Sequence, residues 1–214
     1  MGRRKLTNPL ALAVLALLYE RPMHPYEMAT TLRARHKEES IKLNYGSLYT
    51  VIRLLLREGY IVPQATGRIG WRPERTVYAL TETGRVALHE WLSALIRTPV
   101  KEYPQFEAAL SLLPVLPPEA VLPLLEERLA RLDAEIARQR AAHERALAQG
   151  VERLLLIEGE YHLALLAAER QWVAGFLAEL RAGQFPFLTQ WRAWHATRAV
   201  PSPPTPIAPA REEE

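Results

Sequence analysis

Hydroxyl, phenol and guanidinium side chains are concentrated in residues 44–59, NYGSLYTVIRLLLREG. Such groups donate hydrogen bonds to phosphate oxygens and to base edges in the grooves of DNA, so the chemistry that they support is recognition. Ser47, Thr50 and Arg53 are spaced three residues apart, and on a helix they would lie close together on one face. The polar side chains of this stretch are Tyr45, Ser47, Tyr49, Thr50, Arg53 and Arg57.

The same stretch predicts a helix that would present this polar face. Its large apolar residues recur at three- and four-residue spacing and would form the opposite face; they are Leu48, Ile52, Leu55 and Leu56. Asn44 is a suitable N-cap, and Gly59 stands where a helix can end in the left-handed conformation. An amphipathic helix with an arginine or two is also common on ordinary protein surfaces, so the flanking sequence decides between the two interpretations.

Upstream, the sequence predicts two more short helices. Asn8 is an N-cap followed by a proline, and Leu10–Glu20 is the first helix. His24 and Pro25 open a second helix that runs to about Arg35, and a charged loop, Lys37–Lys42, leads to the third. Three short helices of which the third has a polar face form a helix-turn-helix arrangement.

Downstream, the pattern changes to that of strands. Residues 60–64 and 75–80 are rich in β-branched and aromatic side chains and predict a hairpin. The segment between them, residues 65–74, contains glycines together with Arg68 and Arg72. Such a hairpin tip is typical of a wing that holds flanking duplex at a phosphate or in the minor groove. Thr81 is the expected N-cap of a fourth helix, which continues to about residue 96.

Charge divides the chain into two halves. Residues 1–97 contain 15 Lys and Arg against 8 Asp and Glu, a net charge of +7, whereas residues 98–214 contain 12 against 16, a net charge of −4. A polyanionic partner is therefore expected for the first half alone. The chain has no cysteine, which excludes disulfides and thiolate metal sites. The apolar run at residues 10–18 is too short to span a membrane, so a soluble cytoplasmic protein without a signal peptide is expected.

Three motifs in this order resemble the winged-helix domain of the PadR family of transcriptional regulators. They are HPYEM, NYGSLYTVIRLLLREGYI and RTVYALTETGR, and the resemblance covers about residues 8–97. FEAALSLLPVLPPE and AERQWV, within residues 106–180, resemble the family's helical C-terminal domain. The resemblance implies a homodimer built through that domain, and some family members sense aromatic or drug-like effectors. Many members have glycine where this chain has Pro25, which lacks one backbone N–H donor.

The second half also has a helical pattern of its own. A short helix over residues 106–113 precedes a long one from Pro118 to about Gln149, which carries a heptad-like apolar seam. A second long helix is expected over residues 151–182, and a short helix over 185–198 would present Trp191 and Trp194. Two such seams need each other and a second chain to be buried. The expected dimerisation residues are Leu122, Leu125, Leu129, Leu132, Leu154, Tyr161, Leu165, Trp172 and Phe176.

Catalytic and metal-binding sites are poorly supported. The six histidines never pair at helical spacing, and the sequence lacks HExxH, GxSxG, Walker A and GxGxxG motifs. We therefore expect neither an enzyme, nor a metal site, nor a cofactor. Glu158 and Glu160 are either a buried acid pair or, more commonly, partners of arginines on the neighbouring helix. Trp91 and Trp172 are more typical of core or dimer packing than of a ligand platform.

The sequence thus predicts a mainly α-helical protein with a small β-hairpin wing, in which a winged helix-turn-helix domain precedes long antiparallel dimerisation helices. The expected domains are residues 1–98 for DNA binding, 99–198 for dimerisation and effector binding, and a disordered proline-rich tail over 199–214. The predicted function is sequence-specific regulation, as a repressor, by a homodimer on a pseudo-palindromic operator. A winged-helix module for protein contacts, without specific DNA binding, is the alternative. The expected DNA-binding residues are His24, Tyr26, Lys42, Asn44, Tyr45, Ser47, Tyr49, Thr50, Arg53, Arg68 and Arg72.

Overall fold

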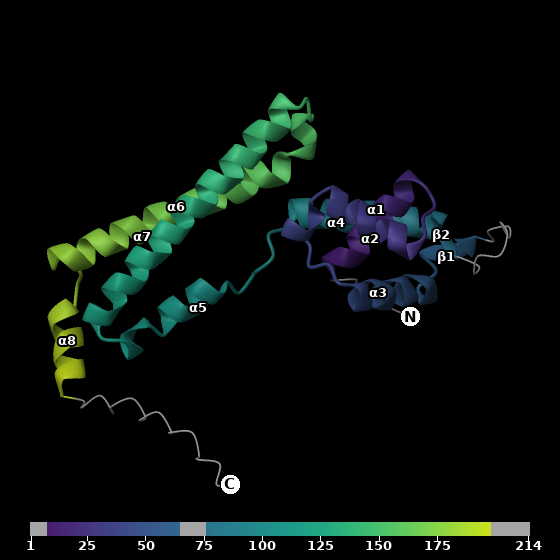
Figure 1. The fold of residues 1–214 in the computed structure, drawn as a ribbon. Helices are drawn as coiled ribbons and strands as arrows, with labels where there is room; N and C mark the ends of the chain where they lie inside the picture. The colour runs from purple at the N-terminus through teal and green to yellow at the C-terminus, as the bar shows by residue number, and fades with distance from the viewer. Residues whose placement is uncertain (1–7, 65–75, 198–214) are drawn as a thin grey trace, which may run out of the picture. The chain divides into compact units, whose positions relative to one another are not determined.

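The structure is a computed structural model in which residues 8–64 and 76–197 are described. The chain divides into two compact units, residues 1–102 and 103–214 (Figure 1). The tip of the expected wing, with Arg68 and Arg72, lies outside the described residues, and so does the proline-rich tail.

The first unit contains the helices and strands that the sequence predicts, in the same order. They are α1 (Pro9–Glu20), α2 (Pro25–Ala34), α3 (Tyr45–Arg57), β1 (Ile61–Gln64), β2 (Val77–Leu80) and α4 (Glu82–Arg97), with a 3-10 turn, η1 (Lys37–Glu39), between α2 and α3. Asn8 accepts a hydrogen bond from the backbone N–H of Leu10 at 3.0 Å and thereby caps α1. The expected boundaries differ from these by one or two residues, as helix ends commonly do.

The core of the first unit is built around α1. This helix is apolar along most of its length and contacts α3, α4 and β2, as expected of a helix that is buried on most of its surface. Leu10, Val14 and Leu15 are fully buried there, together with Leu48 and Leu55 of α3. Burial of each such side chain contributes roughly 1.5–3 kcal/mol. Trp91 of α4 packs against the same cluster, so it is a core residue.

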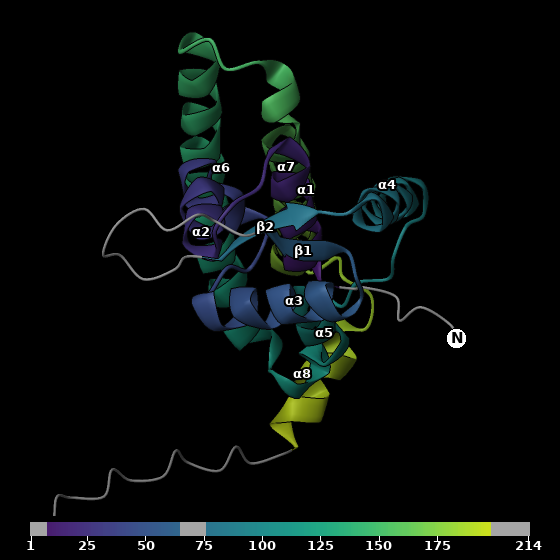
Figure 2. The same ribbon diagram turned by 90° about the vertical axis from the view of Figure 1, so that its right-hand side faces the viewer.

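The strands form a two-stranded antiparallel sheet that begins directly after α3. Ile61 lies opposite Leu80 and Gln64 opposite Val77, and the two arrows run beside each other in Figure 2. Met23, in the turn between α1 and α2, exchanges two backbone hydrogen bonds with Tyr78 at 3.0 and 3.1 Å. The turn before the second helix is therefore tied to the hairpin.

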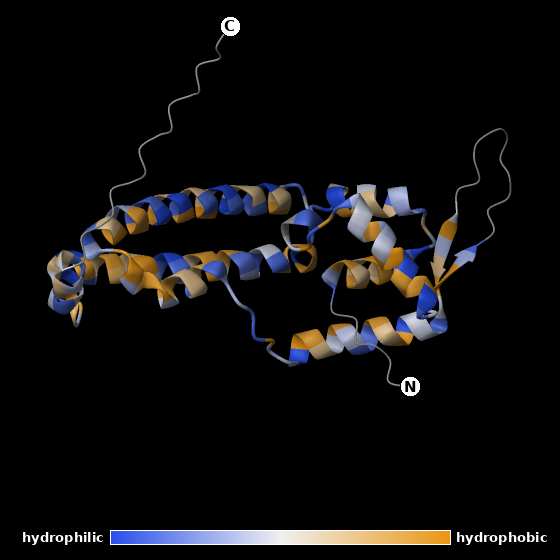
Figure 3. Ribbon diagram, turned by 90° about the horizontal axis from the view of Figure 1, so that it is seen from below, coloured by the Kyte–Doolittle hydropathy of each residue, from blue (hydrophilic) through white to orange (hydrophobic). Residues whose placement is uncertain are grey.

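The second unit is dominated by two long helices. It contains α5 (Gln105–Ser111), η2 (Leu113–Val115), α6 (Pro118–Ala148), η3 (Arg153–Leu155), α7 (Ile157–Ala182) and α8 (Leu188–Ala196). The long helices α6 and α7 lie side by side as an antiparallel pair (Figure 1), and both carry hydrophobic and hydrophilic turns (Figure 3). Val121, Leu125 and Leu132 of α6 face Val173 and Leu177 of α7 in the core of this unit.

Ion pairs between helices use much of the acidic charge of the second half. Arg170 pairs with Asp133 at 2.5 Å, Arg181 with Glu126 at 2.5 Å, and Arg192 of α8 with Glu119 at 2.7 Å; the hydrogen bond from Arg170 lowers the pKa of Asp133. The carboxylates of this unit thus fasten α6 to α7 and α8.

One helix boundary was wrong by six residues. The second long helix begins at Ile157, not at 151, because Gly150 ends the preceding segment at a φ of 80° and the chain needs residues 151–156 to reverse direction. Leu154 therefore lies in the 3-10 turn, 77% exposed, and is not part of the apolar stripe of α7. Glu160 is not half of a buried acid pair either, because it binds Arg153 of this same turn at 2.8 Å.

Candidate nucleic-acid interface

Helix α3 separates its two faces as its sequence requires. Leu48, Val51, Ile52 and Leu55 are buried against the rest of the first unit, whereas Tyr45, Tyr49, Thr50 and Arg53 are exposed and Ser47 is half-buried. The apolar side fixes the orientation of the helix about its own axis, so the polar side must face solvent. A rigid helix that presents hydroxyl, phenol and guanidinium groups is suited to the major groove.

The start of α3 is held by side-chain hydrogen bonds. The Asn44 side-chain oxygen accepts from the Ser47 backbone N–H at 2.7 Å, which makes Asn44 the N-cap. One turn later the Thr50 hydroxyl donates to the Gly46 carbonyl oxygen at 2.9 Å. At the other end Gly59 has a φ of 72°, the left-handed conformation expected from the sequence.

Helix α2 brings two further predicted residues to the surface of the first unit. Nδ1 of His24 accepts from the Tyr26 backbone N–H at 3.1 Å, so this histidine is the N-cap of α2. Pro25 occupies the first helical position, where the missing N–H would have had no partner inside the helix. Tyr26 is exposed and occupies the second helical position, two residues after the cap.

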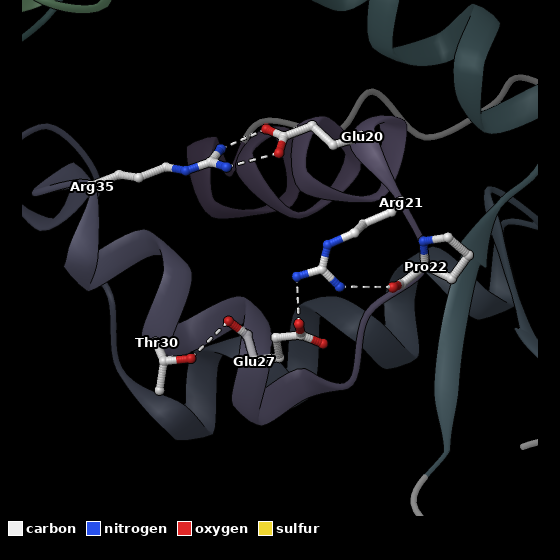
Figure 4. A network of polar contacts seen from close by, with 6 residues as sticks. All are labelled: Glu20, Arg21, Pro22, Glu27, Thr30 and Arg35. Carbon is white, nitrogen blue, oxygen red and sulfur yellow. Dashed lines mark hydrogen bonds and ion pairs between the residues drawn. The ribbon is translucent and has the colours of Figure 1, made fainter. Parts of the chain in front are cut away.

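Most of the arginines that the structure describes in the first unit pair with carboxylates of the same unit. Arg35 makes a two-point contact with Glu20 at 2.5 and 2.8 Å, and Arg21 binds Glu27 at 2.5 Å, which joins the end of α1 to α2 (Figure 4). The hydrogen bond from Arg35 lowers the pKa of Glu20. The Glu20 carboxylate therefore stays ionised at pH values where a free carboxyl group is already partly protonated, and the ion pair weakens as the pH falls below that range. Arg57, at the end of α3, binds Glu58 at 3.0 Å.

Three cations near α3 have no close carboxylate partner among the described residues, since the carboxylate nearest to Arg33, on Glu38, lies at 3.9 Å. Arg53 has a single contact in the described chain, a long hydrogen bond of 3.4 Å to the Thr50 hydroxyl. Lys42 is exposed and forms no ion pair with any carboxylate that the structure describes. Arg33 of α2 donates to the Tyr45 hydroxyl at 2.9 Å. The positive charge that is available to bind a phosphate therefore lies around the N-terminal and middle turns of α3.

Arg33 is the residue that sequence reasoning missed. The predicted set came from α3, the loop before it, the start of α2 and the wing, and Arg33 belongs to none of these, because it occupies the last turn of α2. Only the fold brings it to Tyr45, twelve residues further along the chain. Its basic side chain in the last turn of α2, where a cation is favoured, was the local signal that could have indicated an exposed charge.

The expected dimerisation residues fall into two groups. Leu125 and Leu132 are buried in the chain's own core, and Leu122, Leu129 and Phe176 pack against that core. The side chains of this first group therefore already pack within one chain. The second group is exposed on α7 and consists of Tyr161, Leu165 and Trp172, with exposed fractions between 49% and 67%.

A groove of about 650 Å³ lies beside α7 in the second unit. Aromatic rings follow one another along it, with centroids 5.2 Å apart from Trp172 to Phe176 and 5.3 Å apart from Phe176 to Phe185. Leu110 of α5 and Leu113 complete the apolar lining, and Gln171 and Glu179 supply polar groups. The groove is largely open to solvent, and its lining is mainly apolar.

Comparison with known proteins agrees with this geometry. Residues 14–90 match the model of the Transcriptional regulator PadR-like family. The PadR resemblance is confirmed. The PadR-like segment contains α2, α3, both strands and part of α4, and at this level it indicates DNA-binding transcription regulation, in a family of regulators rather than of enzymes. A comparison with curated protein sequences finds no match.

Solved structures extend the similarity over both units. Bacillus subtilis PadR in complex with operator DNA has a TM-score of 0.63 at 20% identity, over 82% of this chain and 99% of that chain. The same protein in complex with p-coumaric acid has a TM-score of 0.62 at 19% identity, over 80% and 98%. The Vibrio cholerae virulence activator AphA has a TM-score of 0.60 at 22% identity, over 81% and 98%. The expected fold class, a PadR-like winged helix-turn-helix followed by long antiparallel helices, is confirmed.

No helix within residues 8–64 and 76–197 is long and apolar enough to cross a membrane. In the same ranges no three histidine or carboxylate side chains come close enough together to hold a metal ion.

Proposed function

We propose that this chain is a sequence-specific transcriptional repressor that binds a pseudo-palindromic operator as a homodimer. The first unit reads DNA through α3, and the second unit pairs two chains and binds an effector. The proposal rests on the position of Arg53, which is exposed in the middle of α3 while the opposite face of this helix is buried in the core. Its long hydrogen bond to Thr50 is easily replaced by hydrogen bonds to a base.

The predicted DNA-binding residues then take different roles. Arg53 can donate two parallel hydrogen bonds to a guanine, the commonest specific contact in the major groove. Tyr45, Ser47 and Thr50 face bases or nearby phosphates, while His24, Tyr26, Lys42 and Tyr49 fix the register on the backbone and Asn44 positions the helix. Arg68 and Arg72, outside the described residues, are proposed to hold the flanking duplex from the wing.

An exposed apolar stripe on α7 supports the homodimer. It consists of Ile157, Tyr161, Leu165, Ala168 and Trp172, whose three- and four-residue spacing places them on one face. Contiguous apolar surface of this kind marks interaction sites, and a two-fold contact would cover it on both chains at once. A symmetric pair of α3 helices about 34 Å apart would reach successive major grooves. The complex of Bacillus subtilis PadR with operator DNA supports operator binding by this chain.

The aromatic groove is the proposed effector site, and its ligand is an aromatic or drug-like molecule. Trp172 belongs both to the groove and to the stripe, so a ligand there can favour one spacing of the paired chains over another, which is the condition for regulation. The p-coumaric acid complex of Bacillus subtilis PadR supports this class of ligand. Loss of operator affinity on adding aromatic acids or cations is the expected result, and an unchanged affinity across such a panel would contradict the effector role.

Selection of bound duplexes from a random DNA library tests the proposed function. The selected duplexes are expected to share one sequence that reads the same on both strands, with half-sites about 10 base pairs apart. Transcription from a template that carries this sequence across the promoter should fall when the protein is added. A protein that enriches no sequence is instead a module for protein contacts.

Replacement of Arg53 tests its assigned role as the base reader. Arg53→Ala is expected to reduce operator affinity by roughly 1–3 kcal/mol in each half-site and to narrow the difference between operator and random DNA, because the lost hydrogen bonds carry the sequence information. Gel-shift titrations at fixed salt measure both affinities. Arg57→Ala is the matched control, since Arg57 lies one turn further along α3 and already binds Glu58. An equal loss of discrimination in both variants would contradict the assignment.

A further inference from the structure

Arg33 and Tyr45 form an exposed pair that joins the last turn of α2 to the first residue of α3. Arg33 Nη1 donates to the Tyr45 hydroxyl at 2.9 Å, and the guanidinium carbon lies 4.8 Å from the centre of the Tyr45 ring. Neither side chain belongs to the buried core, and the Tyr45 side chain is 42% exposed. The pair therefore fixes two surface groups relative to each other.

The charge of Arg33 is only weakly compensated. Its nearest carboxylate is Glu38, whose Oε2 lies 3.9 Å from Nε, and both side chains are well exposed. An exposed ion pair at this distance contributes little. By contrast, Arg35, two residues along the chain, is held by Glu20 at 2.5 and 2.8 Å. Among the described residues, Nη2 of Arg33 has no hydrogen-bond acceptor.

The pair leaves unused donors suited to a phosphate. Because the Tyr45 oxygen accepts the hydrogen bond from Arg33, its own hydrogen remains available to donate, and the neighbouring positive charge makes it a better donor. A phosphate offers acceptors only, and the planar guanidinium matches its geometry. We propose that Arg33 and Tyr45 form one phosphate clamp that sets the register of α3 on the DNA backbone, which rests on the proposed function.

The clamp contacts the backbone and not the bases. Arg33 is on the helix before the reading helix, and in helix-turn-helix proteins that helix crosses the sugar–phosphate backbone. Tyr45 is the first residue of α3, two turns before Arg53. Backbone contacts position the protein and carry no sequence information, so loss of the clamp must weaken operator and random DNA by the same factor.

Glu38 gives the clamp a competitor within the same chain. A phosphate bound by Arg33 must displace or repel this carboxylate, because both seek the same guanidinium. Glu38→Gln removes the negative charge and keeps the size of the side chain. It is expected to raise affinity for both operator and random duplex about two- to fivefold at low salt, with a smaller gain at high salt.

The test is a salt series of binding titrations on the full-length chain, with the duplex selected above and a random duplex. Arg33→Ala should weaken both duplexes about tenfold and lower the salt slope by about two, one phosphate contact in each protomer. Tyr45→Phe should weaken both with an unchanged slope, because no charge is lost. The double variant should bind no more weakly than Arg33→Ala, since the two groups act together. Arg35→Ala is the matched control and should bind as the wild type does.

The outcomes separate the clamp from the proposed function. A wild-type protein that binds no duplex overturns both. A wild type that binds, with an unchanged salt slope in Arg33→Ala, overturns the clamp alone, and so does a loss confined to the operator, which would make Arg33 a base reader. Thermal melts check that each variant folds, and Arg33→Lys, which keeps the charge but not the planar fork, should retain the slope while losing affinity.

Discussion

Replacement of Leu165 by aspartate is expected to leave the chain folded, to convert the dimer into a monomer and to weaken operator binding about 100-fold or more. Leu165 lies in the middle of the exposed stripe on α7, between Tyr161 and Trp172, and is half exposed. A single chain tolerates a carboxylate there, because water still reaches it. In the proposed dimer the charge would be buried without a partner, which costs several kcal/mol, and the two reading helices would lose the gain from binding together.

Sedimentation or light scattering measures the mass of this variant, circular dichroism its helix content, and gel shift its affinity. Ala178→Asp is the matched control, because residue 178 is exposed on the same helix but about 100° away from the stripe. This control should stay dimeric and bind the operator. A Leu165→Asp protein that remains a dimer with full affinity would contradict the assignment of the interface to α7.

The first unit was the more predictable half, because its signals are local. The capping role of Asn44 depends on a residue three positions away, and the hydrogen bond from Ser47 at 2.7 Å follows directly from helix geometry. The left-handed Gly59 and the Thr81 cap of α4 are signals of the same kind. Leu48, Ile52 and Leu55 were assigned to the core from spacing alone, and the structure buries all three.

Pairing between distant residues was the part that spacing could not give. Arg53 and Arg57 look alike in the sequence, but Glu58 neutralises only the second of them. The Arg33 contact to Tyr45 needs the turn between α2 and α3, whose path no local pattern specifies. Periodicity also shows that a residue is apolar without showing what covers it, so Leu132 was grouped with Leu165 although one is buried within the chain and the other is exposed.

Gly84→Ala is expected to destabilise the first unit by about 2–4 kcal/mol, because the added methyl group would overlap backbone atoms. A Cβ at this position would lie 2.1 Å from the Tyr60 carbonyl oxygen and 2.9 Å from its carbon, so no side-chain rotation can relieve the contact. The first turn of α4 is pressed against the end of α3 by Thr81, whose hydroxyl accepts from the Gly84 N–H at 2.9 Å and donates to the Gly59 carbonyl oxygen at 2.8 Å.

The loss of stability in Gly84→Ala should also weaken DNA binding, because Thr81 and Tyr60 connect α4 to the chain that leaves α3. Thermal melting should show a transition roughly 10 °C lower or more for a unit of this size, and operator affinity should fall as that transition approaches the assay temperature. Gly46→Ala is the matched control within the same unit: its new methyl group meets only the Asn44 side-chain oxygen at 3.7 Å. A helical alanine there should raise stability slightly. Equal melting temperatures for Gly84→Ala and the wild type would show that α4 can move away from Tyr60, and would remove the fixed link between the hairpin and the reading helix.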